Sequence, residues 1–358
     1  MKNLKSVKTK PHPKSNRKAD LLSTVVEHID IKSFDARPIV KSMSKMSFTS
    51  RDLGRAAEIF NTMLQDKSAT SILTLAGSTS AGGCMDLYTE MVKSNMVDCI
   101  VSTGASIVDM DFFEALGFKH YQADSQVDDR DLRDLYIDRI YDTYIDEEQL
   151  QAVDHTIFKI AETLEHRPYS SREFIWEMGK YLSKHGKKKN SLISACYEHG
   201  VPIFCPAFSD SSAGFGLVLH QKKRIEKGHK TYMSIDSVAD FRELTDIKMA
   251  AGTTGLLMIG GGVPKNFVQD TVVCAEILGQ KDVEMHKYAI QITIADVRDG
   301  ACSSSTLKEA CSWGKVDVAS EQMVFAEAGS VMPLLASDAY HRGHWKKRPR
   351  RNWAKLFK

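Results

Sequence analysis

Short apolar runs alternate with amphipathic stretches along most of the chain. Five runs of strand length each end in a loop rich in glycine, serine, threonine or aspartate; they span 71–75, 97–101, 201–204, 255–259 and 288–294. Helical spacing of apolar residues predicts a first helix that Thr49 can cap, followed by helices at 83–94, 147–165, 171–185, 266–278 and 330–340. Apolar strands that alternate with helices are typical of a mostly parallel sheet with helices on both faces. The pattern therefore predicts an α/β fold of the doubly wound, Rossmann-like kind.

The loops that follow the expected strands are the clearest sign of a ligand. They read AGSTSAGG (76–83), STGAS (102–106), SDSSAGFG (209–216), GGGVPKN (260–266) and ADVRDG (295–300). In a parallel sheet such loops share the edge where ligands bind, and small residues let backbone N–H groups approach phosphates. Three consecutive glycines at 260–262 are more than a tight turn needs. A dinucleotide fits this edge, although no G-x-G-x-x-G fingerprint is present.

Four carboxylates lie in or just past these strand-end segments: Asp109, Asp210, Asp299 and Glu327. Each by itself is an ordinary cap or turn residue. Together they could serve ribose hydroxyls or ammonium groups.

Lys315 stands in the sequence CSWGKVDV (311–318). The ordinary interpretation is an exposed lysine at the start of a strand. However, Trp313 is one of only four tryptophans, and Gly314 lets the chain pass close to a neighbour. A lysine held against an indole in a poorly solvated slot would lose proton affinity, as an amine that forms Schiff bases requires. Glu309, one helical turn before Trp313, could hold a cationic substrate.

Composition narrows the class of protein. The 358 residues are 42% hydrophobic and 26% charged, as in soluble globular proteins. No apolar run approaches the roughly 18 residues of a membrane span, and no apolar segment follows the basic N-terminus as in a secretory signal. We therefore expect a cytoplasmic protein. The seven scattered cysteines indicate reduced thiols rather than disulfides or a metal site.

Charge is unevenly distributed. Residues 1–18 carry seven Lys or Arg and residues 341–358 carry eight, without any acid. The remainder, 19–340, has 33 basic and 46 acidic residues, a balance of −13 that would attract small cations. Solvated, partly disordered tails are the simpler interpretation, and contact with nucleic acid or an acidic neighbouring subunit is the alternative.

Several segments, taken in order, resemble the deoxyhypusine synthase family, and its bacterial deoxyhypusine synthase-like members in particular. They are FDARPIVKSMSKMSFTSRDLGRAAEIF, NMVDCIVSTGAS, PIFCPAFSDSS, GGGVPKN, EACSWGKV and AEAGSVMPLL. S-W-G-K is the most specific. The resemblance covers roughly 34–340, which we expect to form a single domain between a basic extension (1–33) and a basic tail (341–358).

The resemblance implies a chemistry. Family members use NAD to oxidise spermidine, carry its aminobutyl fragment on the S-W-G-K lysine as an imine, and pass the fragment to an acceptor amine. Carried over by motif, Lys315 is that lysine, and Asn266, Asp299, Glu309 and Trp313 would line the amine site. The residues that would contact NAD are Gly77, Ser78, Thr103, Gly104, Asp109, Asp210, Gly261, Ala295 and Glu327. The resemblance also implies a homotetramer with active sites between subunits.

Several polar residues of the family pattern are replaced on the amine side. Asn266 stands for a histidine, Cys302 and Phe215 for aspartates, and Val108 for an acid. The donor polyamine and the acceptor thus stay open: a protein lysine, or a small amine such as putrescine, as in a homospermidine synthase-type transfer. A catalytically silent NAD- or polyamine-binding homologue is the remaining alternative.

Overall fold

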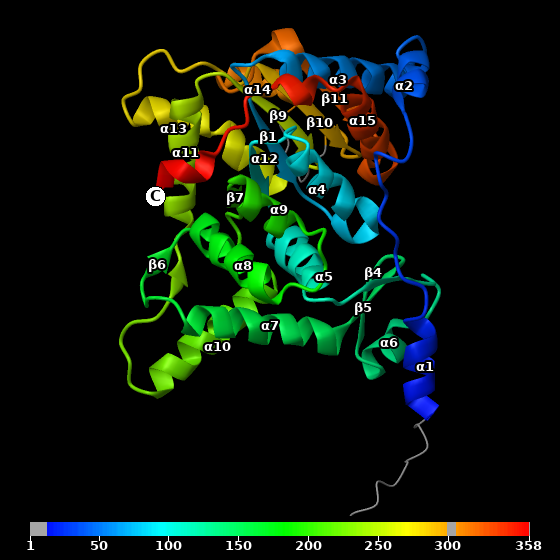
Figure 1. The fold of residues 1–358 in the computed structure, drawn as a ribbon, viewed down its shortest axis with the longest axis vertical. Coiled ribbons are helices and arrows are strands. Elements are labelled where there is room, and N and C mark those ends of the chain that lie inside the picture. The colour runs from blue at the N-terminus through cyan, green and yellow to red at the C-terminus, as the bar shows by residue number, and fades with distance from the viewer. Residues whose placement is uncertain (1–12, 299–305, 358) are drawn as a thin grey trace, which may run out of the picture.

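The computed structural model describes residues 13–298 and 306–357, and a six-stranded sheet lies at its centre (Figure 1). Every pair of neighbouring strands in this sheet is parallel, in the order β11-β10-β9-β1-β2-β7. The strands are β1 (Thr70–Leu75), β2 (Cys99–Ser102), β7 (Ile203–Phe204), β9 (Thr254–Ile259), β10 (Tyr288–Thr293) and β11 (Glu321–Phe325). Five of them coincide with the apolar runs of the sequence, and β11 was not foreseen.

Helices cover both faces of the sheet, which confirms the predicted doubly wound α/β fold. On one face, alternate strand residues such as Leu73 and Ile290 join a core with α3 (Phe48–Gln65), α4 (Met85–Lys93) and α15 (Ala328–Arg342). On the other face, Ile72 and Leu256 pack with residues of three further helices. These are α11 (Ser237–Ala251), α12 (Gly262–Gln269) and α14 (Leu307–Ser312). All six residues of β1 and of β9 are buried, as the continuous apolar runs require.

Helix boundaries differ from the expected ones where turns intervene. The expected helix at 266–278 is two helices, α12 and α13 (Thr271–Ile277). The helix that the sequence predicted near Thr49 is α3, which begins at Phe48 after Ser47. Thr49 therefore does not cap that helix; its hydroxyl donates to the Phe325 carbonyl at 3.4 Å.

A second group of elements lies beside the sheet and extends into the lower half of Figure 1. It contains α7 (Glu147–Glu162), α10 (Ser212–Glu226), α8 (Ser171–His185) and α9 (Leu192–His199). A three-stranded antiparallel sheet is formed by β3 (His120–Gln122), β4 (Ile137–Ile140) and β5 (Thr143–Asp146), with α6 (Asp129–Asp134) against it. The remaining elements are α1 (Pro13–Leu21), α2 (Arg37–Met43), α5 (Phe113–Ala115), β6 (Pro168–Tyr169) and β8 (Ser234–Ile235).

The C-terminal segment, residues 344–357, packs across the amino edge of the central sheet. The Arg348 side chain pairs with Asp98 at 2.5 Å just before β2, and both side chains are at most 2% exposed. Arg350 donates to the Lys93 carbonyl at the end of α4, and Arg351 donates to the Lys67 and Ser68 carbonyls beyond α3. The expectation of a solvated tail is therefore wrong for these residues, because their guanidinium groups pair with a buried carboxylate and with backbone carbonyls of the folded body.

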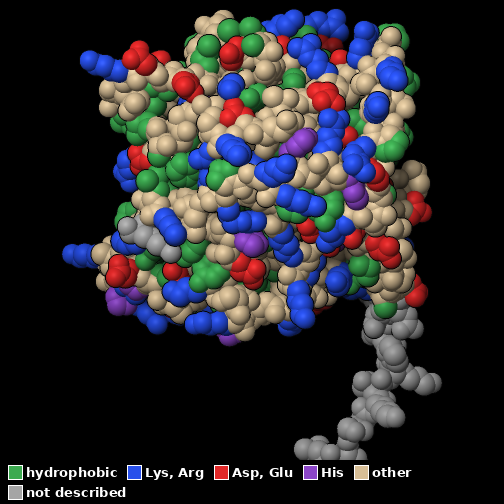
Figure 2. Space-filling view, turned by 45° about the horizontal axis from the view of Figure 1, so that its top comes forward, with side chains coloured by type: hydrophobic (Ala, Val, Ile, Leu, Met, Phe, Trp, Pro, Cys, Tyr) green, Lys and Arg blue, Asp and Glu red, His purple; other side chains and the backbone are tan. Residues whose placement is uncertain are grey.

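Arg17 and Lys18, near the N-terminus, also pair with acidic side chains. Lys18 Nζ lies 2.9 Å from an Asp146 carboxylate oxygen, and Arg17 pairs with Asp131 at 2.7 Å. On the face shown in Figure 2, lysine and arginine side chains are interspersed with acidic ones. Within the described residues, no helix has the length and apolar character that crossing a membrane requires.

Replacing Arg348 by alanine should destabilise the fold by about 3 kcal/mol, because it leaves the Asp98 carboxylate buried without a counter-ion. Burial already raises the pKa of Asp98. Urea unfolding at pH 7 measures the loss. Lys355→Ala, an exposed position in the same segment, is the control and should change stability by less than about 0.5 kcal/mol. An equal, small effect of both variants would contradict this account.

Candidate functional site

The carboxyl edge of the central sheet gathers most of the residues expected to contact a cofactor. With one exception, they lie one to six positions after the end of a strand, and all six strands contribute at least one of them. Gly77 and Ser78 follow β1, Thr103 and Gly104 follow β2, Asp210 follows β7, Gly261 follows β9, Ala295 follows β10 and Glu327 follows β11. The exception, Asp109, lies one turn into the helical segment Ala105–Phe112 after β2. The structure thus places these nine residues at one edge; their role toward a cofactor stays a prediction.

The loops after β1, β2 and β7 are hydrogen-bonded to one another. The Ser106 hydroxyl donates to the Gly77 carbonyl at 3.1 Å, and Thr103 Oγ1 donates to Ser106 Oγ at 3.1 Å. Ser211 lies so close to Gly104 that a Cβ there would come within 2.8 Å of it. Glycine at 104 is therefore required for the loop after β2 to pass the loop after β7.

Asp109 is the most perturbed acid of this edge. It accepts a hydrogen bond from the Ser212 backbone N–H at 2.8 Å. Burial raises its pKa to about 6, and the nearby carboxylates of Asp154 and Asp210 add to the rise. Asp154, on α7, was missed, because a single acid on an amphipathic helix carries no signal; only the packing of α7 against α10 brings it near. Three carboxylates around Ser212 can accept hydrogen bonds from hydroxyls or ammonium groups.

The geometry of this edge fits a dinucleotide. Gly77 has φ +86°, which only glycine adopts readily, and a Cβ there would meet nothing within 4 Å. The space beside its backbone is therefore open to a ligand. Gly260 has φ +71° and packs on Ala76, and the Glu327 carboxylate accepts the N–H groups of Gly329 and Ser330 at the start of α15. Burial opposes ionisation of Glu327, but these hydrogen bonds outweigh it and hold its pKa below the ordinary value.

Lys315 lies at the opposite, amino edge of the sheet. Its neighbour Val316 pairs with His286, just before β10 begins. The Lys315 amine is 2.5 Å from an Asp270 carboxylate oxygen and 5.2 Å from the centre of the Trp313 ring. The contact with the indole that the sequence led us to expect is present. The Trp313 side chain is 68% exposed, so the slot is open on one side in this chain.

The other residues expected on the amine side are distributed differently. Asn266 lies on α12, four residues before Asp270 and thus on the same helix face. The Glu309 carboxylate accepts the Thr306 N–H at 2.5 Å and forms a capping box at the start of α14. Asp299 and Cys302 lie outside the described residues. Val108 is fully buried, whereas Phe215 is exposed on α10.

A buried polar chain beneath Lys315 was missed by the sequence analysis. Lys248 Nζ donates to Thr254 Oγ1 at 3.1 Å, and Thr254 Oγ1 lies 2.8 Å from His286 Nδ1. His286 Nε2 lies 3.1 Å from the Val268 carbonyl, which can only accept, so Nε2 carries the proton and Nδ1 accepts from Thr254. Burial, aided by the Lys248 charge, lowers the pKa of His286 to about 3, and burial lowers that of Lys248 to about 8.

His286 therefore connects three segments of the amine side. Its side chain holds the end of α12, directly before Asp270, and reaches β9 through Thr254. Its backbone N–H donates to the Lys315 carbonyl at 2.9 Å, and its carbonyl accepts from the Asp317 N–H. An isolated histidine gives no such signal in the sequence.

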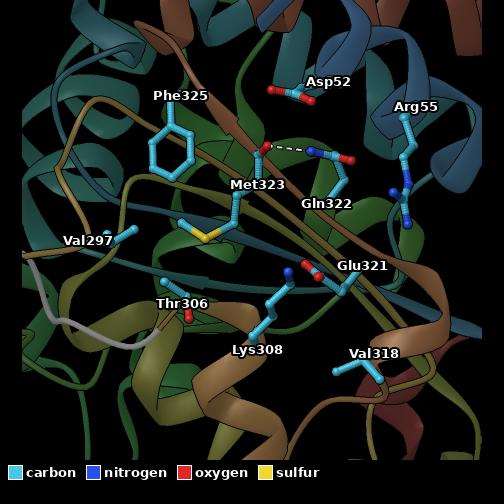
Figure 3. A pocket seen from close by; sticks show the side chains of 10 residues that line it. All are labelled: Asp52, Arg55, Val297, Thr306, Lys308, Val318, Glu321, Gln322, Met323 and Phe325. Atoms are coloured by element: carbon cyan, nitrogen blue, oxygen red, sulfur yellow. Dashed lines mark hydrogen bonds between the residues drawn. The ribbon is translucent and has the colours of Figure 1, made fainter. Parts of the chain in front are cut away.

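A pocket of about 520 Å³ lies elsewhere, along the free edge of β11 (Figure 3). Asp52 and Arg55 of α3 line it on one side, and Thr306 and Lys308 on the other. Among the expected cofactor- and amine-site residues that the structure describes, none lines this pocket.

Comparisons with known proteins agree with the resemblance seen in the sequence. A family model described as deoxyhypusine synthase matches residues 38–339. A deoxyhypusine synthase-like protein of Coxiella burnetii is 72% identical over 95% of this chain and 96% of its own length. A probable deoxyhypusine synthase 2 of Methanosarcina acetivorans is 37% identical over 89% and 91%. A solved structure of a putative deoxyhypusine synthase from Entamoeba histolytica shares the fold, with 19% identity, a TM-score of 0.58 and coverage of 92% and 99%.

The neutral, buried His286 should make the fold sensitive to acid. Because its pKa is about 3 in the folded chain and about 6.5 when unfolded, the unfolded state binds the extra proton between these values. The unfolding free energy should be unaffected by this group above pH 6.5 and should fall by up to about 1.4 kcal/mol per pH unit below it.

Urea unfolding between pH 7 and pH 4 tests this. His286→Asn should reduce the slope of the unfolding free energy against pH below pH 6.5 by the equivalent of about one proton. His229→Asn, an exposed position, should leave that slope unchanged. If His286→Asn kept the wild-type slope of unfolding free energy against pH, the neutral, buried state of His286 would be refuted.

Proposed function

Because this chain belongs to the deoxyhypusine synthase family, we propose that it is an NAD-dependent transferase that moves an aminobutyl group from a polyamine to an acceptor amine through Lys315. One observation carries the proposal. The Lys315 amine, in the S-W-G-K sequence, lies between the Trp313 ring and the Asp270 carboxylate, on a backbone fixed on both sides. The amine is thus held in one place and only 18% of the side chain is exposed.

The residues at the carboxyl edge would hold the cofactor. Bound NAD would accept a hydride from the carbon next to the donor's secondary amine and return one to the product. Gly77, Gly104 and Gly261 let the backbone approach the phosphates, and Asp109 and Glu327 supply carboxylates for ribose hydroxyls. Ser78, Thr103, Asp210 and Ala295 complete the edge.

Lys315 acts as the nucleophile. Its neutral amine adds to the imine carbon of the oxidised donor, and the bond from that carbon to the departing nitrogen then breaks. The electron pair stays with the leaving nitrogen, so that diaminopropane departs from spermidine and the four-carbon fragment remains on Nζ as an imine. An acceptor amine then adds to this imine carbon, and the bond from that carbon to Nζ breaks, which frees Lys315.

The remaining residues of the amine side orient the donor. Trp313 offers an aromatic face to a cationic amine, and Asn266 offers a hydrogen-bonding amide. At the carboxyl edge, the Asp154 carboxylate near Asp109 can pair with an ammonium end. Asp299 and Glu309 are the further candidates by family motif.

The separation of the two halves of the site supports a shared active site. Within one chain, α12 leads from the glycine loop to Asp270 over eight residues, about 12 Å. The carboxyl-edge loops and Lys315 therefore lie at different ends of the same helix. Because the carbon that loses the hydride is also the carbon that Lys315 attacks, the cofactor and the amine must reach one point, and loops of a second copy in a homotetramer that face Lys315 would meet this requirement.

The donor half-reaction is tested by incubating the protein with NAD and spermidine without an acceptor. Diaminopropane should be released, and borohydride should trap an aminobutyl adduct on Lys315 that mass spectrometry locates. Lys315→Ala and Lys315→Arg should abolish both signals, because neither side chain can form the imine, while NAD binding persists.

The outcomes separate the alternatives. NAD binding without release or adduct, for spermidine and for other polyamines, would indicate a silent binding homologue. When release is observed, adding putrescine or a lysine-bearing protein identifies the acceptor. Lys315→Arg that retained turnover would contradict the mechanism.

A shared site predicts complementation between copies. Lys315→Ala and Asp109→Ala should each be inactive alone, by at least about 100-fold. After mixing and subunit exchange, activity should recover to about a quarter of wild type if the two residues act across an interface, since random pairing leaves one intact site in four. Recovery should be absent if each chain holds a complete site. Light scattering on the same samples reports whether mixed oligomers form.

A further inference from the structure

Asp270 occupies an unusual position for an aspartate. It ends α12 and immediately precedes α13, the N-cap position where aspartate side chains normally accept a hydrogen bond from the helix. Its carboxylate makes no such bond. It is turned instead toward Lys315, 2.5 Å from the amine. A capping contribution is therefore replaced by a contact with a reactive group.

The pair does not serve stability. The side chains of Lys315 and Asp270 are 18% and 41% exposed, and partly exposed ion pairs contribute little to folding. Both backbones are held independently of the pair. Lys315 N–H donates to the Ala310 carbonyl, and Asp270 N–H donates to the Asn266 carbonyl, each at 3.0 Å. The ion pair can therefore be broken and reformed without moving the chain.

Glu309, the carboxylate that the sequence suggested near the amine, is committed elsewhere. Its oxygens cap α14 through Thr306. Other titratable groups on the elements next to Lys315 include Lys265 on α12, Lys308 on α14, Asp317 just beyond Lys315, and Lys248 and the neutral His286 below. Asp317 accepts from the Ala319 N–H and caps its own turn. Among the described residues, Asp270 is thus the acid in direct contact with the nucleophile.

We propose that Asp270 is a catalytic residue that carries protons from Lys315 Nζ to the departing nitrogen. This rests on the proposed function for the identity of the donor. One proton passes from the Lys315 ammonium to the carboxylate, which leaves a neutral amine with a free electron pair. The amine adds to the imine carbon, and Asp270 gives its proton to the departing nitrogen.

The second proton follows the same route. After the new C–N bond forms, Nζ loses another proton to Asp270, which passes it to the departing nitrogen as that C–N bond breaks. The products are a protonated imine on Lys315 and a neutral leaving amine, so atoms and charge balance. Asp270 ends as a carboxylate beside the positively charged imine, which it stabilises electrostatically.

The test uses the full-length protein and butanal, so neither NAD nor spermidine is needed. Imine formation on Lys315 is followed by borohydride quenching and mass spectrometry, and Lys315 acetylation by a water-soluble succinimidyl ester reports access to the free amine. Asp270→Asn should slow imine formation about 100-fold. It should leave acetylation equal or faster, because the ammonium loses its counter-charge.

Controls separate proton transfer from positioning. Asp317→Asn, two residues beyond Lys315, should match wild type in both reactions. Asp270→Glu, which keeps a carboxylate, should recover at least a tenth of the wild-type rate, and urea midpoints should be equal throughout. Imine formation in Asp270→Asn within twofold of wild type would overturn the proposal. So would an equal fall in both reactions, because access to the amine would then have changed.

The same data stand apart from the proposed function. If spermidine yields no diaminopropane but butanal labels Lys315 in an Asp270-dependent way, the proton carrier is established and only the donor is wrong. If butanal labelling does not depend on Asp270 but spermidine is cleaved, the proposed function holds and the proposed role of Asp270 as a proton carrier is refuted.

Discussion

Parallel pairing of six strands constrains where chemistry can lie in this molecule. Because every strand of the central sheet runs in the same direction, all strand-to-helix loops meet at one edge and all helix-to-strand returns meet at the other. Burial of both faces leaves only these edges for polar function. The small-residue loops occupy the first edge. The second edge carries Lys315, and α12 is the element that joins the two.

At the amino edge of the sheet, backbone carbonyl groups and a buried carboxylate need partners, and the C-terminal segment supplies them. The ends of α3 and α4 direct carbonyl groups, and hence partial negative charge, toward this edge. Asp98 adds a buried carboxylate. Arg348, Arg350 and Arg351 satisfy these groups from a single short segment. Residues that look like a basic tail in the sequence are thus part of the folded body.

The two polar networks near Lys315 illustrate opposite uses of burial. The chain through Lys248, Thr254 and His286 is buried and each of its members is hydrogen-bonded, which suits a rigid joint because breaking one contact leaves a neighbour unpaired. The pair of Lys315 and Asp270 is partly solvated and can exchange partners at little cost. A rigid support beneath a labile ion pair is the arrangement that a reversible nucleophile needs. At the other edge, Asp109 combines burial with two neighbouring carboxylates, which suits reversible contact with hydroxyls or amines.

The sequence alone determined the elements that depend on local pattern. Buried parallel strands must be continuously apolar, and loops that approach a ligand must be small, so β1, β2, β9 and β10 and the glycine loops were predictable. S-W-G-K likewise marked Lys315 with its indole neighbour. β11 was missed, because on an edge its residues Glu321–Phe325 need no continuous apolar run.

Only the tertiary structure decided the long-range contacts. Asp270, Asp154 and His286 have no local signature, since the partner of each is distant in the sequence. Asp270 pairs with Lys315, and Asp154 is hydrogen-bonded to Ser212. His286 contacts Thr254 on β9, 32 positions away. Arg348 reads as a solvated charge until Asp98 is seen beside it. The physical reason is common to all: period and composition record which face of an element is buried, whereas the pairing of single polar groups depends on how those faces meet.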